Sequence, residues 1–119
     1  MWLAYEYNGR EVFHAAGLRQ VESFGRRIED RVDIATHDLG FLYQLSCAAA
    51  SQLTGDARAA EIAVEAADRL MDRYLPAAGI IQAWGSLDDP AQQGRTIIDS
   101  LMNAPLLHWA SRHTGNPHY

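Results

Sequence analysis

The stretch Leu39–Gly55 (LGFLYQLSCAAASQLTG) decides the fold class, because it contains no Asp, Glu, Lys or Arg. A helix that is uncharged on every side is expected to be buried on every side. Residues 56–75 differ, since acidic side chains recur there every three or four positions. The opposite side of that helix is apolar and consists of Ala59, Ile62, Ala63, Ala66, Ala67 and Leu70. We therefore predict an inner helix followed by an amphipathic outer helix.

The rest of the chain extends this alternation. We predict helices near 1–7, 10–28, 39–53, 56–75 and 97–113, with inner helices at 39–53 and 97–113, no sheet, and a loop over 79–85. Gly9, Gly55 and Gly115 each follow a helical segment, as expected of glycines that end helices in the left-handed conformation. Their recurrence indicates stacked helical hairpins, and hence a solenoid or a closed α/α barrel.

Composition excludes several function classes. The chain has 119 residues, 48% of them hydrophobic, and a net charge of −5 with no basic run, so we expect one domain and no nucleic-acid partner. No uncharged run reaches the roughly 20 residues of a membrane span, and no signal peptide is visible, so we expect no membrane partner and a cytoplasmic location. Cys47 is the single cysteine and is expected to be buried. Both ends resemble cuts through a larger fold.

Two aspartates are the candidates for chemistry. Asp38 precedes the uncharged helix, and Asp99 lies among apolar residues near the start of the second inner helix. Parallel inner helices would bring both carboxylates to one face. For Asp38 the alternative is a helix N-cap. For Asp99 we expect a position inside the helix, where lost hydration favours the protonated form that a general acid needs, and Arg95 as an ion-pair partner that would oppose it.

Other polar and aromatic residues give weaker signals. His37 stands beside Asp38, where it could orient the carboxylate, bind a sugar hydroxyl or be structural. Trp84 lies between small residues and could stack on a sugar ring or fill the edge of a core. The remaining histidines lack the spacing of a zinc site, so we expect no metal.

Three segments resemble the unsaturated glucuronyl hydrolases, glycoside hydrolase family 88, and occur in that family's order. They are His37–Phe41 (HDLGF), Ile80–Gly85 (IIQAWG) and Gly94–Asn103 (GRTIIDSLMN). Trp2–Tyr7 (WLAYEY) and Ala110–Gly115 (ASRHTG) are also similar. The resemblance implies an all-α (α/α)6 barrel, a six-hairpin toroid. Because the family's fold needs about three times this length, residues 1–119 would form a partial (α/α)6 glycosidase-like domain.

The resemblance also implies a function. The family removes a terminal 4,5-unsaturated glucuronic acid from oligosaccharides made by polysaccharide lyases, and it hydrates the vinyl ether double bond without cofactor or metal. Asp99 would be the general acid and base, Asp38 the second essential aspartate, and His37 and Trp84 would bind sugar. The related unsaturated rhamnogalacturonyl hydrolases and a non-catalytic scaffold of helical hairpins are the alternatives.

The resemblance further implies what an isolated fragment does. We expect this chain alone to be inactive, because part of the substrate pocket is absent. We also expect self-association through apolar edges formed by Trp2, Leu3 and Tyr5 at one end and by Leu106, Leu107 and Trp109 at the other.

Overall fold

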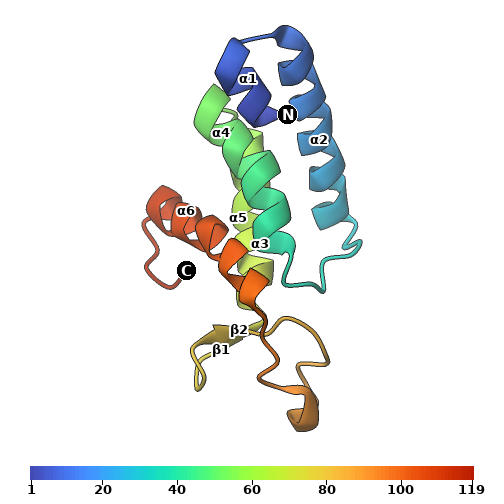
Figure 1. Cartoon of the computed structure of the whole chain (residues 1–119), viewed down its shortest axis with the longest axis vertical. Coiled ribbons are helices and arrows are strands. Elements are labelled where there is room, and N and C mark those ends of the chain that lie inside the picture. The colour runs from blue at the N-terminus through green and yellow to red at the C-terminus, as the bar shows by residue number, and fades with distance from the viewer.

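The computed structural model describes all 119 residues and is dominated by helices (Figure 1). A first hairpin joins α1 (Trp2–Asn8) to α2 (Glu11–Glu29). A second joins a long helix, Leu39–Thr54, to α5 (Ala57–Met71). The last helix is α6 (Ala104–Thr114). Gly9, Gly55 and Gly115 end α1, the long helix and α6 in the left-handed conformation, with φ of 64°, 73° and 75°, which confirms the predicted stops.

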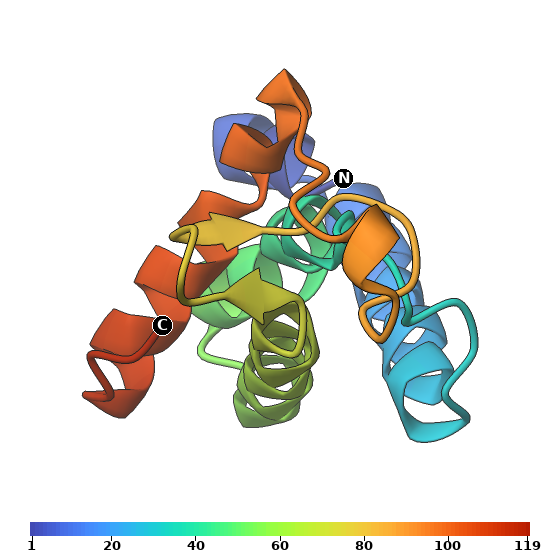
Figure 2. The same ribbon diagram turned by 90° about the horizontal axis from the view of Figure 1, so that it is seen from below.

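The long helix is the predicted inner helix, with one local change of winding. It consists of α3 (Leu39–Tyr43), a π-helical turn η1 (Gln44–Ala48) and α4 (Ala49–Thr54). Seen from below, the long helix lies in the middle of the molecule, with α2, α5 and α6 around it (Figure 2). The predicted packing of an uncharged inner helix against the amphipathic helix that follows it is therefore confirmed.

Burial supports the assignment of the outer helix. The six apolar residues predicted for one side of α5 are all buried. Glu65 and Arg69 on its polar side form an ion pair at 2.7 Å. The inner helix departs from expectation: Leu39, Tyr43 and Cys47 are buried, but Phe41, Leu45 and Leu53 are 41%, 53% and 38% exposed. One apolar side of this helix is thus only partly covered by the rest of the chain.

Two boundaries differ from the prediction. The helix expected over 56–75 ends at Met71, and a short antiparallel hairpin follows, made of β1 (Tyr74–Leu75) and β2 (Ile80–Ile81). The prediction of no sheet was therefore wrong, although the sheet has only these two strands. Gly79, with φ of 66°, makes the turn, and the β-branched Ile80 and Ile81 favour the extended backbone.

The segment expected as a helix over 97–113 is divided. A 3-10 turn η3 (Ile98–Met102) precedes α6, and a further 3-10 turn, η2 (Pro90–Gln92), lies in the loop before it. Pro105 occupies the first turn of α6. Proline is tolerated there because it lacks only an N–H that has no helical partner, whereas it would break a helix interior.

The ends of the chain are more buried than predicted. Trp2, Leu106 and Trp109 are only 2%, 0% and 8% exposed, so they do not form the expected apolar edges. The ring of Trp2 lies against Gly17 of α2, where an added Cβ would approach it to 2.6 Å. Leu3, at 76% exposure, is the expected edge residue that is exposed. No helix combines the length and apolar character that crossing a membrane requires.

Candidate functional site

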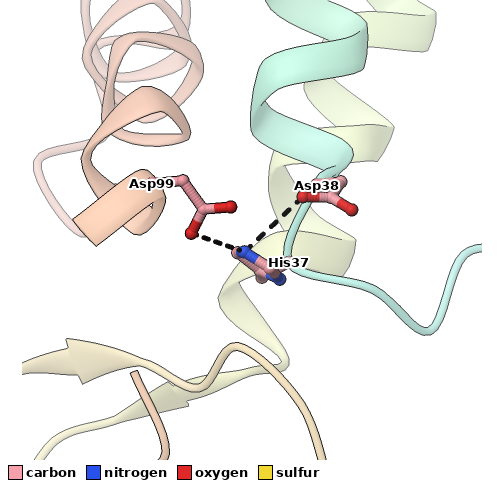
Figure 3. A group of neighbouring side chains, drawn as sticks. All are labelled: His37, Asp38 and Asp99. Carbon is pink, nitrogen blue, oxygen red and sulfur yellow. Dashed lines mark hydrogen bonds and ion pairs between the residues drawn. The ribbon is translucent and has the colours of Figure 1, made fainter. Parts of the chain in front are cut away.

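Asp38 and Asp99 meet at the imidazole of His37 (Figure 3). Nε2 of His37 lies 3.3 Å from Oδ1 of Asp99 and 3.5 Å from Oδ1 of Asp38. Asp38 stands at the start of α3, and Asp99 is in η3, just before α6. The two carboxylates are thus on the same side of the helix layer, as the parallel inner helices predicted.

Asp38 occupies the N-cap position of α3 but does not act as a cap. Its side chain makes no capping hydrogen bond. Its backbone, at φ −66° and ψ −7°, is helical, whereas a capping residue is typically extended. Asp56 shows the contrast, since it is extended at ψ 109° and accepts a hydrogen bond from the Ala59 N–H at 3.0 Å. The N-cap alternative for the Asp38 carboxylate is therefore wrong.

The Asp38 carboxylate instead has polar neighbours outside the helix. Oδ2 accepts a hydrogen bond from the Thr36 hydroxyl at 3.3 Å, and Oδ1 faces His37. The side chain is 53% exposed. One side of this carboxylate is therefore held by the protein, and the other is open to solvent or to a ligand.

Asp99 is less enclosed than predicted. It lies in the 3-10 turn and not inside α6, and its side chain is 51% exposed. The expected ion pair with Arg95 is absent, and His37 is the partner of Asp99 instead. The reason is tertiary: α3 and η3 lie side by side, so a histidine 62 residues away is nearer than the arginine four positions back.

His37 is the buried member of the cluster, with 9% of its side chain exposed. In one tautomer Nε2 of His37 donates a hydrogen bond to the Asp99 oxygen, and in the other it accepts one from a protonated Asp99 carboxyl, at 3.3 Å. The contact can therefore orient the Asp99 carboxyl and exchange a proton with it. These are the properties required of a group that orients a general acid.

The same three residues are the ones that could hold a metal ion. Each can offer one ligand atom, and these atoms lie within 4.8 Å of one another. A metal would bind Nε2 through the lone pair of an unprotonated nitrogen, whereas donation of a hydrogen bond from Nε2 to a carboxylate uses a proton there. The two uses exclude each other, and the absence of a metal in the function stays a prediction.

Trp84 lies in the loop after β2 and is 47% exposed, as a sugar platform must be. Two buried residues that sequence reasoning missed hold this loop. The Gln82 side chain donates to the Gly85 and Ser86 carbonyls and accepts from the Gly94 N–H. Arg73 donates to the carbonyls of Ala35, Gln82 and Ala83, which connects the loop to the segment leading to His37.

Arg73 is unusual because its buried guanidinium contacts carbonyl groups and no carboxylate. It is 6% exposed, and desolvation lowers its pKa from the ordinary value. Its position directly after an amphipathic helix resembles that of an ordinary surface cation. No local sequence signal therefore distinguishes it from Arg69, which is a partly exposed ion-pair partner.

Asn103 is the other residue that sequence reasoning did not single out. It is 1% exposed, its Oδ1 accepts from the Phe41 N–H at 2.8 Å, and its Nδ2 lies 3.5 Å from the Asp99 carbonyl oxygen. It therefore contacts both elements that carry the aspartates. Its place at the end of Gly94–Asn103 was the available signal.

Comparison with known proteins identifies similar chains. The chain is 47% identical over all 119 residues to the unsaturated glucuronyl hydrolase of Bacillus sp. (strain GL1), of which it covers 32%. It is 44% identical over the same length to the unsaturated chondroitin disaccharide hydrolase of Streptococcus pneumoniae (strain ATCC BAA-255 / R6), of which it covers 30%. No model of a protein family matches the chain. It spans about a third of the length of these relatives.

Solved structures similar to this chain belong to the same group of proteins as the sequence relatives. The crystal structure of the Bacillus sp. GL1 enzyme, described as responsible for the degradation of glycosaminoglycan, matches with a TM-score of 0.92 over 99% of this chain and 31% of that one. The Streptococcus agalactiae unsaturated glucuronyl hydrolase matches with a TM-score of 0.90 at 45% identity, over 97% of this chain and 29% of that one. The resemblance is confirmed, and the helical hairpins form part of an (α/α)6 barrel.

Proposed function

We propose that this chain, which corresponds to about a third of an unsaturated glucuronyl hydrolase, supplies the two carboxylates that remove a terminal 4,5-unsaturated glucuronic acid from lyase-generated oligosaccharides. The observation that carries the proposal is the junction of Asp38, His37 and Asp99, in which two carboxylates flank one buried imidazole. A relative of 46% identity has been solved with dGlcA-Glc-Rha-Glc, which supports an unsaturated oligosaccharide as substrate.

Asp99 is proposed as the general acid and base. Its carboxyl proton goes to C4, and the electron pair of the C4=C5 bond forms the new C4–H bond. The cation left at C5 is stabilised by the ring oxygen. The Asp99 carboxylate then takes a proton from a water molecule as the water oxygen bonds to C5. The resulting hemiketal opens to a ketone at C5, and the hemiacetal left at C1 releases the remaining sugar as an alcohol.

The neighbouring residues have supporting roles in this proposal. The open side of the Asp38 carboxylate binds sugar hydroxyls, while its fixed negative charge stabilises the cationic intermediate. His37 orients the Asp99 carboxyl through the 3.3 Å contact and is within reach of a sugar hydroxyl. Trp84 offers an exposed ring on which a sugar face can stack.

Residues 1–119 act in this proposal as a partial (α/α)6 domain that is inactive alone. The carboxylates are half exposed, so water reaches them, and we expect the groups that fix the substrate carboxylate beside Asp99 in the other two thirds of the barrel. The exposed apolar groove formed by Met1, Leu3, Leu45 and Leu53 lies between α1 and the inner helix. In a complete barrel further helices would cover this groove, and in the isolated chain it promotes self-association.

The test is a chimera in which residues 1–119 replace the matching segment of the Bacillus sp. GL1 enzyme. It should consume an unsaturated chondroitin disaccharide, seen as loss of the ultraviolet absorbance of the C4=C5 bond. An unsaturated rhamnogalacturonan disaccharide, assayed side by side, should react much more slowly. A folded chimera that is inactive on both substrates would favour a non-catalytic scaffold, and preference for the second would favour a rhamnogalacturonyl hydrolase.

A further inference from the structure

The start of α3 is capped from a distant part of the chain. The first N–H groups of a helix have no helical partner and are usually satisfied by the side chain of the N-cap residue. In α3 that residue is Asp38, but the Phe41 N–H donates to Oδ1 of Asn103 at 2.8 Å. An amide 62 positions away therefore does what the Asp38 carboxylate would ordinarily do.

Gly40 allows Asn103 to come close enough to cap the helix in place of Asp38. An added Cβ at Gly40 would lie 2.5 Å from Cα, Cβ and the carbonyl oxygen of Asn103. Two of these atoms belong to the backbone, so the clash could not be relieved by turning a side chain. A residue with a side chain at position 40 would push α3 away from Asn103 and lengthen the Phe41 hydrogen bond.

We propose that Asn103 and Gly40 are positioning residues, which keep the Asp38 carboxylate out of the helix cap and thereby free for the sugar. The inference rests on the proposed function for the use of that carboxylate, but the exchange of caps stands on geometry alone. Asn103 also approaches the Asp99 carbonyl oxygen at 3.5 Å, so one buried amide joins the two segments that carry the aspartates.

Asp56 shows the arrangement that Asp38 would have as a helix cap. Asp56 has an extended backbone, and its carboxylate caps α5 through the Ala59 N–H. Without Asn103, the unsatisfied Phe41 N–H would draw the Asp38 carboxylate into the same arrangement. A carboxylate in that arrangement points along the helix axis and away from a ligand in front of His37.

Amide NMR of this chain, recorded across the pH range in which carboxylates titrate, tests the inference without substrate or turnover. In the wild type the Ala59 amide shift should follow the titration of its carboxylate cap, whereas the Phe41 amide shift should stay constant. In Asn103→Ala the Phe41 amide should become pH-dependent like that of Ala59. Its hydrogen exchange should also accelerate about tenfold, as loss of one hydrogen bond implies.

Gly40→Ala should reproduce the Asn103→Ala result while keeping the amide side chain. It replaces Asn103→Ala as the test if that variant does not fold. Gly25→Ala is the control for a glycine in another contact between helices, because its Cβ would meet Ile62 Cδ1, the movable end of a side chain, at 2.8 Å and would leave Asn103 in place. That variant should leave the Phe41 amide unchanged. A wild-type Phe41 amide that already titrates, or one that never titrates in either site variant, overturns the inference, whatever the activity of the complete barrel.

Discussion

Nε2 of His37 lies 3.3 Å from Oδ1 of Asp99, and 62 residues separate the two in the chain. The contact joins the start of the inner helix to the turn that precedes α6. It arises because α3 packs against α6, which places the segments leading into both helices side by side. The arrangement of the candidate acid therefore depends on packing between hairpins.

Replacement of Asp99 by Asn should abolish the proposed chemistry in the chimera with the Bacillus sp. GL1 enzyme. Asn is nearly isosteric but cannot carry the proton, so kcat should fall about 10²- to 10⁴-fold, the usual contribution of a general acid or base. Loss of the ultraviolet absorbance of the unsaturated sugar measures it. Asp30→Asn is the control, since Asp30 is exposed, stands at the C-terminal end of α2 and is not part of the cluster. Near-normal turnover by Asp99→Asn would remove Asp99 from the acid–base role.

Replacement of Arg73 by Met should destabilise the chain strongly. The carbonyl groups of Ala35, Gln82 and Ala83 would lose their donor, the last two in buried residues, and we expect the free energy of unfolding to fall by about 2–4 kcal/mol. Arg69→Met, which removes a partly exposed ion pair on the helix surface, should cost less than about 1 kcal/mol. Urea unfolding compares the two, and equal losses would contradict the structural role of Arg73.

Cys47 should make the chain less stable at alkaline pH. Burial raises the pKa of its thiol from 9.0 to about 11, so between these values the unfolded chain loses a proton that the folded chain retains. The contribution of the buried thiol to the free energy of unfolding is therefore fully present below pH 9. Above pH 9 it falls by about 1.4 kcal/mol per pH unit. Urea unfolding from pH 8 to 10 measures the slope. Cys47→Ala should flatten it, and an unchanged slope would show that the thiol does not contribute.

A charge in the apolar groove should prevent association of the isolated chain. Leu45 lines the groove and is 53% exposed, so Leu45→Glu should convert an associating sample to monomer in light scattering. Val32→Glu is the control, because Val32 is 48% exposed in the loop after α2, outside the groove. A wild-type chain that is monomeric at every concentration would contradict the proposed association.

Sequence reasoning identified the features that depend on local composition. The uncharged segment and the amphipathic repeat predicted the inner and outer helices, and Gly55 predicted the end of the inner one. It failed where tertiary contacts dominate. No hydrophobic periodicity in the sequence indicates the 3-10 turn that carries Asp99 or the exposure of its side chain. The buried ends of the chain also escaped prediction, because the packing of Trp2 on Gly17 depends on how two helices approach.

The sequence by itself determined the layered helices, the glycine turns and the identity of the two candidate carboxylates, because hydrophobic periodicity and turn chemistry act over a few neighbouring residues. Only the tertiary structure decided what those carboxylates contact. Asp38 has the sequence position of a helix cap, yet the helix N–H of Phe41 donates to Asn103. Asp99 has the sequence position of an ion-pair partner for Arg95, yet it contacts His37. Both contacts depend on the close approach of α3 to the segment before α6. The distance between these segments is set by side chains that are far apart in the sequence and packed together in the fold.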